Sequence, residues 1–600
     1  MYKIRTNRNE VFESQNESIL ETMQKHGIYL QASCGGKGSC GRCKVKVTEG
    51  VVSSLSFFGI SEKEKTSGYV LACQSYPKTD ISIEIPERLI TVSERISGAK
   101  VEIIDKIFTD NPHLFKPLIE SMHLSIQPPT IEDSRADFER LKDAVGKNIF
   151  IARKTVKILS DYLRENNWQV KFVLSENEFI NFLQSDEKIY AIAIDIGTTT
   201  VALAIVDLEK GKIVDLATCY NSQIAYGDDV ITRIIYAIEN LNGLEILRKS
   251  VVDDINALIN TVKIRNKNSK ILYVSLSGNT TMSHIFWGIN PKYIREEPYV
   301  PVLNHYPLWK ASDARLLLDS NVPVYTLPSV AGYIGGDIVS GVLASGIYKN
   351  ENISLFIDIG TNGEVVIGNK DWLVTASTSA GPCFEGSGIN CGMRATEGAI
   401  ESFTYNKAGD FFKIKVIGNG KPSGICGSGM IDIVSELFTK GIINQKGKFL
   451  SESSKYIKMV DDELRFVISE ECFISQADVD NIIRAKAAIY AGILTLLEEV
   501  GVSEKDIDKV YIAGGFGEFL DIKKAINIGM LPNISEDRFI FLGNTSLAGA
   551  TLCLLSRQLK DLAEELADKM TYIDLSSSKR FMDEYVSALF LPHTDIERFT

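Results

Sequence analysis

The sequence has no excess of basic residues. Among its 600 residues, 65 Lys and Arg stand against 77 Asp and Glu, which leaves a formal net charge of -12. Without a global positive field, the chain is a poor candidate for binding nucleic acid. It also has no uncharged apolar run of membrane-spanning length, and residues 1–10 lack the apolar core of a signal peptide. We therefore expect a cytoplasmic protein that binds neither nucleic acid nor a membrane.

The composition predicts several folded domains. Hydrophobic residues make up 44% of the chain and charged residues 24%, as in ordinary globular proteins, and this length has room for about four domains. The ten cysteines are not expected to form disulfides, because the cytoplasm is reducing. Four of them lie close together near the start of the chain, which indicates a separate module.

These four cysteines have the spacing of an iron–sulfur site. Cys34, Cys40 and Cys43 share one glycine-rich loop, and Cys73 follows from a remote segment. Four thiolates can hold two irons, and the glycines let backbone amides approach the cluster sulfurs. Zinc is the alternative, although it is usually held by two paired Cys-x-x-Cys knuckles. The pattern resembles the [2Fe-2S] ferredoxin family, in the adrenodoxin-like branch with its longer first spacing, and this implies a one-electron carrier.

Hydrophobic patterning divides the chain into four parts. Short strands and one helix surround the cysteines, prolines interrupt the next segment, and a strand–glycine texture begins near Ile189. We predict an α+β ferredoxin-like (β-grasp) domain over residues 1–95, a linker over 96–130, a small α/β middle domain over 131–186, and a large duplicated α/β body over 187–600.

Two segments of the large body each join an apolar strand to an Asp-x-Gly-Thr turn. They begin at Asp195 and Asp358, and the second echoes the first. Such a turn directs backbone amides and hydroxyls toward phosphate, and its carboxylate can orient Mg²⁺ through water ligands. The repetition predicts two duplicated halves whose turns face one cleft.

A third loop, Gly514-Gly-Phe-Gly517, follows a helical run and a strand. In this order the three loops resemble the phosphate and adenosine loops of the superfamily that unites acetate and sugar kinases, heat-shock chaperone ATPases and actin. The resemblance implies an actin-like, ribonuclease-H-like fold that binds ATP, with Asp195 and Asp358 as the catalytic carboxylates. The residues it places around the nucleotide are Gly197, Thr198, Thr199, Thr200, Gly360, Thr361, Asn362, Gly363, Glu364, Gly514, Gly515, Phe516 and Gly517.

Two further segments, 335–345 and 543–550, are predicted helices with small residues at close spacing. Two such helices can cross tightly, and in the resembled superfamily they form a hinge that converts nucleotide state into a domain angle. We include Gly335, Gly336 and Asp337, at the start of the first helix, among the nucleotide-site candidates.

For other candidate residues, an ordinary structural role is an alternative to a functional one. Gly278, Asn279 and Thr280 follow a strand and either contact the γ-phosphate or form an ordinary turn. The glycine-rich runs 379–388 and 424–429 are predicted to border the cleft, the second through Gly427, Ser428 and Gly429. Cys383, Cys391 and Cys426 are expected to be structural thiols, and His284 a packed core residue.

Over nearly its whole length, the chain resembles the reductive activators of corrinoid proteins, which join a [2Fe-2S] domain, a linker, a middle domain and an actin-like ATPase domain in this order. The resemblance implies that one electron passes from the cluster to a Co(II) corrinoid protein and restores Co(I) for methyl transfer, with ATP and Mg²⁺. It also implies a low-potential electron donor, a homodimer and anaerobic one-carbon metabolism. The implied metal ligands are Cys34, Cys40, Cys43 and Cys73.

Three alternatives remain open. An activator of a radical dehydratase would share the ATPase but bridge one [4Fe-4S] cluster between two subunits, and Cys391 with Cys426 could imitate its ligand pair. A small-molecule kinase with a fused redox sensor would transfer phosphate to a sugar or an acid. A non-enzymatic binding module would need an inactive nucleotide site, which the intact Asp195 and Asp358 disfavour.

Overall fold

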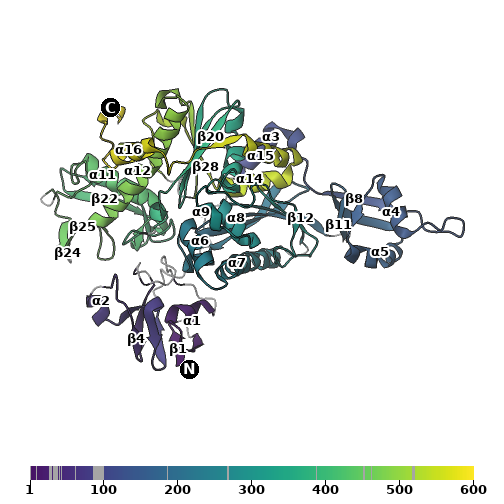
Figure 1. The fold of residues 1–600 in the computed structure, drawn as a ribbon, viewed down its shortest axis with the longest axis horizontal. Coiled ribbons are helices and arrows are strands. Elements are labelled where there is room, and N and C mark those ends of the chain that lie inside the picture. Colours follow the sequence, from purple (N-terminus) through teal and green to yellow (C-terminus); the bar gives the residue numbers. More distant parts are fainter. Residues whose placement is uncertain are drawn as a thin grey trace.

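The computed structural model describes residues 2–7, 10–25, 30, 38, 41, 43–60, 62–85, 101–184, 187–266, 269–386, 388–450, 453–460, 462–515 and 520–599. Within these residues, four larger β-sheets follow one another along the chain. Figure 1 shows the first sheet, in purple, below the main body, and the second, in blue, projecting to the right.

The first sheet has the strand order β2-β1-β7-β3-β5. Strand β1 pairs in parallel with β7 and antiparallel with β2, so the two ends of the domain meet at its centre. Ile4 and Val45 point into one hydrophobic cluster with Leu20 of helix α1. The elements are β1 (Tyr2–Thr6), β2 (Val11–Ser14), α1 (Ile19–Lys25), β3 (Lys44–Glu49), β5 (Tyr69–Leu71) and β7 (Ile81–Glu84), with the hairpin of β4 (Val52–Ser54) and β6 (Ser75–Pro77) and the short helix α2 (Glu62–Thr66) beside it.

The second sheet has the order β8-β10-β11-β9 and carries two helices. Leu141 and Leu159 from these helices pack with Phe172 of the sheet in one cluster. Within the segment predicted as a linker, the chain forms helix α3, which packs against α14, and strand β8, which pairs with β10. The elements are α3 (Val101–Asp110), β8 (Glu120–Ser125), α4 (Asp137–Val145), β9 (Phe150–Ile151), α5 (Arg153–Glu165), β10 (Gln169–Ser175) and β11 (Glu178–Leu183).

The two remaining large sheets are built alike. In each, a central strand begins an antiparallel meander on one side and pairs in parallel with later strands on the other. The first lobe contains β12 (Lys188–Ile196), β13 (Thr200–Asp207), β14 (Lys212–Tyr220), β15 (Ser269–Gly278), β16 (Trp309–Lys310) and β17 (Pro323–Thr326). The second contains β18 (Ser354–Ile359), β19 (Gly363–Gly368), β20 (Leu373–Thr378), β27 (Lys509–Ala513), β28 (Phe539–Gly543) and β29 (Met570–Tyr572).

Helices cover the sheets of both lobes, because the strands are apolar on both faces. Small sheets and short elements complete the second lobe. The helices are α6 (Val230–Glu239), α7 (Gly243–Arg265), α8 (Thr280–Trp287), α9 (Lys292–Arg295), α11 (Gly427–Thr439), α12 (Gln476–Glu499), α13 (Ile522–Asn527), α15 (Arg557–Lys569) and α16 (Lys579–Ala588), and the further strands are β21 (Ala399–Asn406), β22 (Phe411–Val416), β23 (Gly424–Ile425), β24 (Ile457–Val460), β25 (Glu463–Val467) and β26 (Phe473–Ser475).

Helices α10 (Gly336–Ser345) and α14 (Thr545–Leu555) pack between the two lobes, where the sequence predicts them. Their backbones approach so closely that a Cβ atom at Gly549 would lie 2.5 Å from the Cα of Ser340. A Cβ at Gly341 would meet the ring of Phe356 at 2.2 Å. Small residues are therefore required at this crossing.

The sheets agree with the predicted architecture: a small mixed sheet and a second four-stranded sheet precede two α/β lobes that are built alike. Among the described residues, no helix is both long and apolar enough to cross a bilayer.

Candidate functional site

Two equivalent turns face each other between the lobes. Asp195 lies near the end of β12 and Asp358 near the end of β18, each in a strand whose other residues are mostly buried. In the turns that follow, the hydroxyl oxygens of Thr199 and Thr361 lie 3.2 Å apart. We call Asp195–Thr200, Asp358–Glu364 and the adjoining Glu385 the phosphate-loop site. The structure thus brings together two segments that the sequence predicts to share one site.

Glu385 lies between the two turns. Its Oε2 atom accepts hydrogen bonds from the hydroxyls of Thr199 and Thr361, the second at 3.0 Å. The sequence predicts that the glycine-rich run containing Glu385 borders the site, but no spacing distinguishes this glutamate from other acidic residues. Its position follows from the packing of the short helix η6 (Pro382–Glu385) against α11 and α12.

The first turn is anchored by helix α14. The Asp195 carboxylate accepts from the Asn544 side-chain amide at 2.8 Å and from the Ser546 hydroxyl at 2.7 Å. Ser277, at the end of β15, has its hydroxyl 2.9 Å from that of Ser546 and 3.0 Å from that of Ser340 in α10. Both crossing helices are therefore hydrogen-bonded to the turn or to its neighbours.

Arg233, on α6, holds the backbone of the first turn. It is fully buried, and its guanidinium donates to the carbonyls of Thr198 and Gly227 and to the side chain of Gln223. Burial lowers the pKa of Arg233 to about 10. Sequence reasoning missed this residue because an arginine within an amphipathic helix is usually exposed.

Carboxyl groups within the site and beside it, at Asp337, repel one another. Burial, together with the neighbouring carboxylates, raises the pKa of Asp358 to about 8 and that of Asp337 to about 7. The pKa values of Asp195 and Glu364 are also raised, first by burial. A cation at this place would relieve the repulsion. Within the ranges that the structure describes, no three His, Cys, Asp or Glu side chains are arranged to hold a metal ion directly.

Glycines shape the edges of the site. Gly514 has a φ of +101°, and a Cβ there would lie 2.4 Å from the Ile359 carbonyl oxygen and 3.2 Å from a carboxylate oxygen of Asp358. The predicted adenosine loop therefore starts against the second turn, and at Gly515 the space is open. Phe516 and Gly517 lie outside the described residues.

Several other predicted residues have close-packed backbones in the same region. A Cβ at Gly335 would lie 2.5 Å from the Thr280 nitrogen, so the start of α10 rests on the turn at Gly278. A Cβ at Gly197 would lie 2.7 Å from the Thr200 carbonyl oxygen. The remaining close-packed glycines among the predicted residues are Gly278, Gly336, Gly363 and Gly429.

Some predicted side chains have internal partners. Asn279 caps α8 by accepting from the Thr281 amide, and Thr280 donates to the Ala331 carbonyl. Asn362 hydrogen-bonds to the carboxylate of Glu364, and the backbone carbonyl of Asn362 accepts from the Gly360 amide. Ser428, in the first turn of α11 after Gly427, donates to the Glu401 carbonyl.

The first domain brings two of the predicted metal ligands together. The backbone amide of Cys73 donates to the Cys43 sulfur at 3.4 Å, and the two side chains are 5% and 1% exposed. A buried sulfur that accepts from a backbone amide suits an iron–sulfur cluster, whose sulfurs are stabilised by such hydrogen bonds. Cys34 and Cys40 lie outside the described residues.

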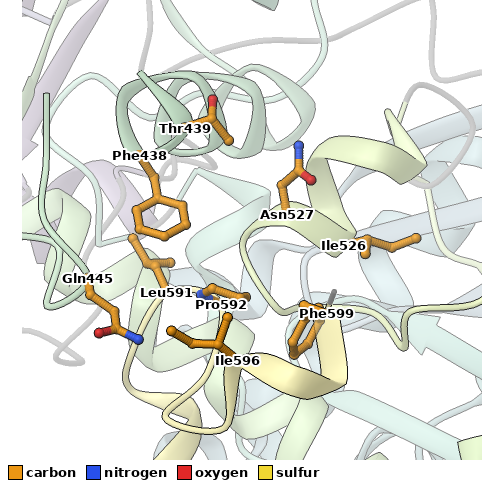
Figure 2. Close-up of a pocket in the computed structure, with 9 residues that line it drawn as sticks. All are labelled: Phe438, Thr439, Gln445, Ile526, Asn527, Leu591, Pro592, Ile596 and Phe599. Carbon is orange, nitrogen blue, oxygen red and sulfur yellow. The ribbon is translucent and has the colours of Figure 1, made fainter. Parts of the chain in front are cut away.

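The cysteines of the second lobe each donate to a backbone carbonyl or are deeply buried. Cys391 donates to Glu471 and Cys426 to Ile400, and burial raises the pKa of Cys383 to about 12. Such thiols suit structural roles. A surface cavity of about 460 Å³ lies in the same lobe, between α11, α13 and the C-terminal segment (Figure 2), and none of the predicted site residues lines it.

Family models match the chain in four consecutive parts. Residues 4–78 match the 2Fe-2S iron-sulfur cluster binding domain, and residues 109–191 match the RACo linker region. Residues 190–350 match the RACo middle region, and residues 352–600 match the C-terminal domain of RACo, the ASKHA domain.

Relatives that match most of the chain agree with these family matches. The chain is 31% identical to the corrinoid activation enzyme RamQ of Eubacterium limosum, over 96% of both chains. It is 25% identical to the [Co(II) methylated amine-specific corrinoid protein] reductase of Methanosarcina barkeri, over 67% of this chain and 76% of that one. A solved structure titled reductive activator for corrinoid,iron-sulfur protein is 40% identical, covers 100% of both chains and superposes with a TM-score of 0.76. The predicted resemblance is confirmed: the chain belongs to the family of reductive activators of corrinoid proteins.

Proposed function

We propose that this protein is an ATP-dependent reductive activator that passes one electron from a [2Fe-2S] cluster to a Co(II) corrinoid protein and restores the Co(I) state. The observation that carries the proposal is the meeting of Thr199 and Thr361, 3.2 Å apart, in a chain whose first domain also brings Cys43 and Cys73 into contact. One polypeptide thus combines an electron-transfer site with a site for phosphates.

Cys43 and Cys73, with Cys34 and Cys40, would hold the cluster, which when bound supplies one-electron chemistry at low potential. The Cys73 amide stabilises negative charge on the Cys43 sulfur by hydrogen bonding. Both side chains are nearly excluded from water, which keeps the ligand sulfurs away from solvent oxidants.

The phosphate-loop site would bind ATP. The hydroxyls of Thr199 and Thr361 would face the phosphates, and the open space at Gly515 would admit the adenosine. Asp195 and Asp358 would position Mg²⁺ through its water ligands. The cation would relieve the repulsion between their carboxylates. ATP would supply free energy for transferring an electron to an acceptor of lower potential. Each ~59 mV of one-electron potential difference corresponds to about 1.4 kcal/mol.

The cobalt belongs to the partner, a corrinoid protein, and a low-potential protein or small molecule supplies the electron. We further propose that the activator works as a homodimer, and that the crossing of α10 and α14 acts as the hinge between the lobes.

The experiment follows Co(I) formation by anaerobic visible and electron-paramagnetic spectroscopy, in a mixture of the reduced protein and a Co(II) corrinoid protein. We expect Co(I) only when Mg-ATP is present together with a reduced [2Fe-2S] signal. A [2Fe-2S] signal without effect on any corrinoid protein would favour a redox-sensing kinase, and a [4Fe-4S] signal would favour an activator of a radical dehydratase.

A further inference from the structure

Glu385 places an anionic oxygen where a phosphate oxygen would bind. Hydroxyls from both phosphate loops, those of Thr199 and Thr361, converge on its Oε2 atom. These two threonines are 9% and 5% exposed, so water has little access to their hydroxyls. Hydroxyls and amides that converge on one anionic oxygen are also the usual surroundings of a bound phosphate.

Two glycines near Glu385, one on each side in the chain, have positive φ angles. Gly381 and Gly386 have φ angles of +75° and +91°, which residues with a side chain rarely adopt. A Cβ at Gly386 would lie 2.7 Å from the Met393 nitrogen, so the chain folds back on itself here. Gly386 and Met393 are in close backbone contact, and Glu385 and Arg394 are their immediate neighbours in the chain.

Arg394 has an unused donor beside the first phosphate loop. Its guanidinium lies over the ring of Tyr220, 4.4 Å from the ring centre, and Tyr220 is the sheet partner of Thr200. Its Nη1 atom is buried, and no hydrogen-bond partner for it is found among the described residues. A buried donor nitrogen without an acceptor is costly, and an anion would supply the acceptor.

We propose that Glu385 competes with a nucleotide phosphate for the hydroxyls of Thr199 and Thr361, and that Arg394 contacts the phosphate that displaces it. This inference rests on the proposed function and names the two residues that respond to the phosphates. The carboxylate opposes binding, because it holds the donors and repels a phosphate. The guanidinium favours binding, because the phosphate supplies its missing acceptor.

The test measures the dissociation constants of Mg-ATP and of adenosine by calorimetry, with the intact, anaerobically purified chain. Glu385→Gln and Glu385→Ala are expected to bind Mg-ATP about tenfold more tightly than the unchanged protein, and Arg394→Met about tenfold more weakly. Adenosine carries no phosphate, so its affinity should stay the same in all variants. Glu470→Gln, an exposed glutamate of the same lobe, is the matched control and should change neither value.

The opposite signs separate this role from a structural one. If both substitutions weaken Mg-ATP binding, or if they change adenosine binding equally, the segment only supports the fold and the inference is wrong. Unchanged Mg-ATP affinity in both Glu385 variants would equally overturn it. If the unchanged protein binds adenosine but not Mg-ATP, the proposed function itself fails first.

Discussion

Asp358 is the carboxylate on which ATP turnover should depend most. It ends a central strand, lies beside Gly514, and has a pKa raised to about 8 by burial and by Asp337, Asp195 and Glu385. Asp358→Asn should lower the ATP turnover number by about a hundredfold or more, because an amide cannot orient a hydrated cation or accept a proton. The visible spectrum of the cluster should stay unchanged.

The matched control for this variant is Asp371→Asn, since Asp371 is exposed in the hairpin between β19 and β20. It should retain full turnover. A changed cluster spectrum in Asp358→Asn would mean that the ATPase body takes part in holding the metal.

His284 makes stability depend on pH. It is fully buried; its Nε2 atom accepts from the Val302 amide, and Nδ1 lies 2.8 Å from the Thr280 carbonyl oxygen. Burial lowers the pKa of His284 from 6.5 to about 4, so the folded protein favours the neutral ring. The free energy of unfolding is therefore not reduced by His284 above pH 6.5. As the pH falls toward 4, protonation of His284 lowers the free energy of unfolding by at most about 3 kcal/mol.

Urea unfolding at a series of pH values measures this loss. His284→Gln should unfold more easily at pH 7 and show a flatter decline toward pH 4 than the unchanged protein. The exposed His123→Gln should leave the decline unaltered. If the free energy of unfolding declines equally toward pH 4 in His284→Gln and in the unchanged protein, groups other than His284 cause the decline.

At the scale of elements, the crossing of α10 and α14 joins the two lobes and also contacts Asp195 in the first turn of the phosphate-loop site. Asn544 and Ser546 begin α14 and donate to Asp195, and Ser340 of α10 lies beside Gly549. A shift of either helix therefore displaces a group that contacts the first phosphate loop. Under the proposed function, this contact would link nucleotide binding to the angle between the lobes.

Gly549→Val tests the closeness of this crossing. A Cβ at this position would lie 2.5 Å from the Ser340 Cα, so the helices must separate, at a cost of about 2 kcal/mol or more. Thermal unfolding should show a lower midpoint than for Gly420→Ala, because no atom lies within 4 Å of a Cβ at Gly420. Equal midpoints for the two variants would show that the crossing tolerates a wider spacing.

At the scale of the whole molecule, the proposed electron-transfer and nucleotide sites adjoin separate hydrophobic cores. Cys43 and Cys73 belong to the hydrophobic core of the first domain. Ile357 and Ile359, beside Asp358, belong to the hydrophobic core of the second lobe. Domains with separate cores fold independently. Cys73→Ala should therefore abolish the [2Fe-2S] spectrum and change the dissociation constant of Mg-ATP by no more than about twofold.

Cys219→Ala, a half-buried thiol of the first lobe, is the control and should retain both cluster and nucleotide binding. If Cys73→Ala also loses Mg-ATP binding, the two parts do not fold independently, and the order of assembly would have to start from the first domain.

Much of the site was predictable because its motifs are local. Three cysteines in one glycine-rich loop and two Asp-x-Gly-Thr turns are set by a few neighbouring residues whose backbone conformations glycine permits. The duplicated lobes follow from the repeated strand-and-turn pattern, and the paired sheets confirm them. The domain boundaries and the roles of individual site residues stay predictions.

Other features depend on residues far apart in the chain. Glu385 contacts Thr199 across 186 positions, and Ser546 contacts Asp195 across 351. No local pattern identifies these partners, because each contact exists only after two lobes and two crossing helices have packed together. The sequence by itself determined which loops can bind a cluster or a phosphate, since backbone sterics act between neighbours. The tertiary structure alone decided which carboxylate, amide and guanidinium groups face those loops, since packing brings distant side chains within hydrogen-bonding reach.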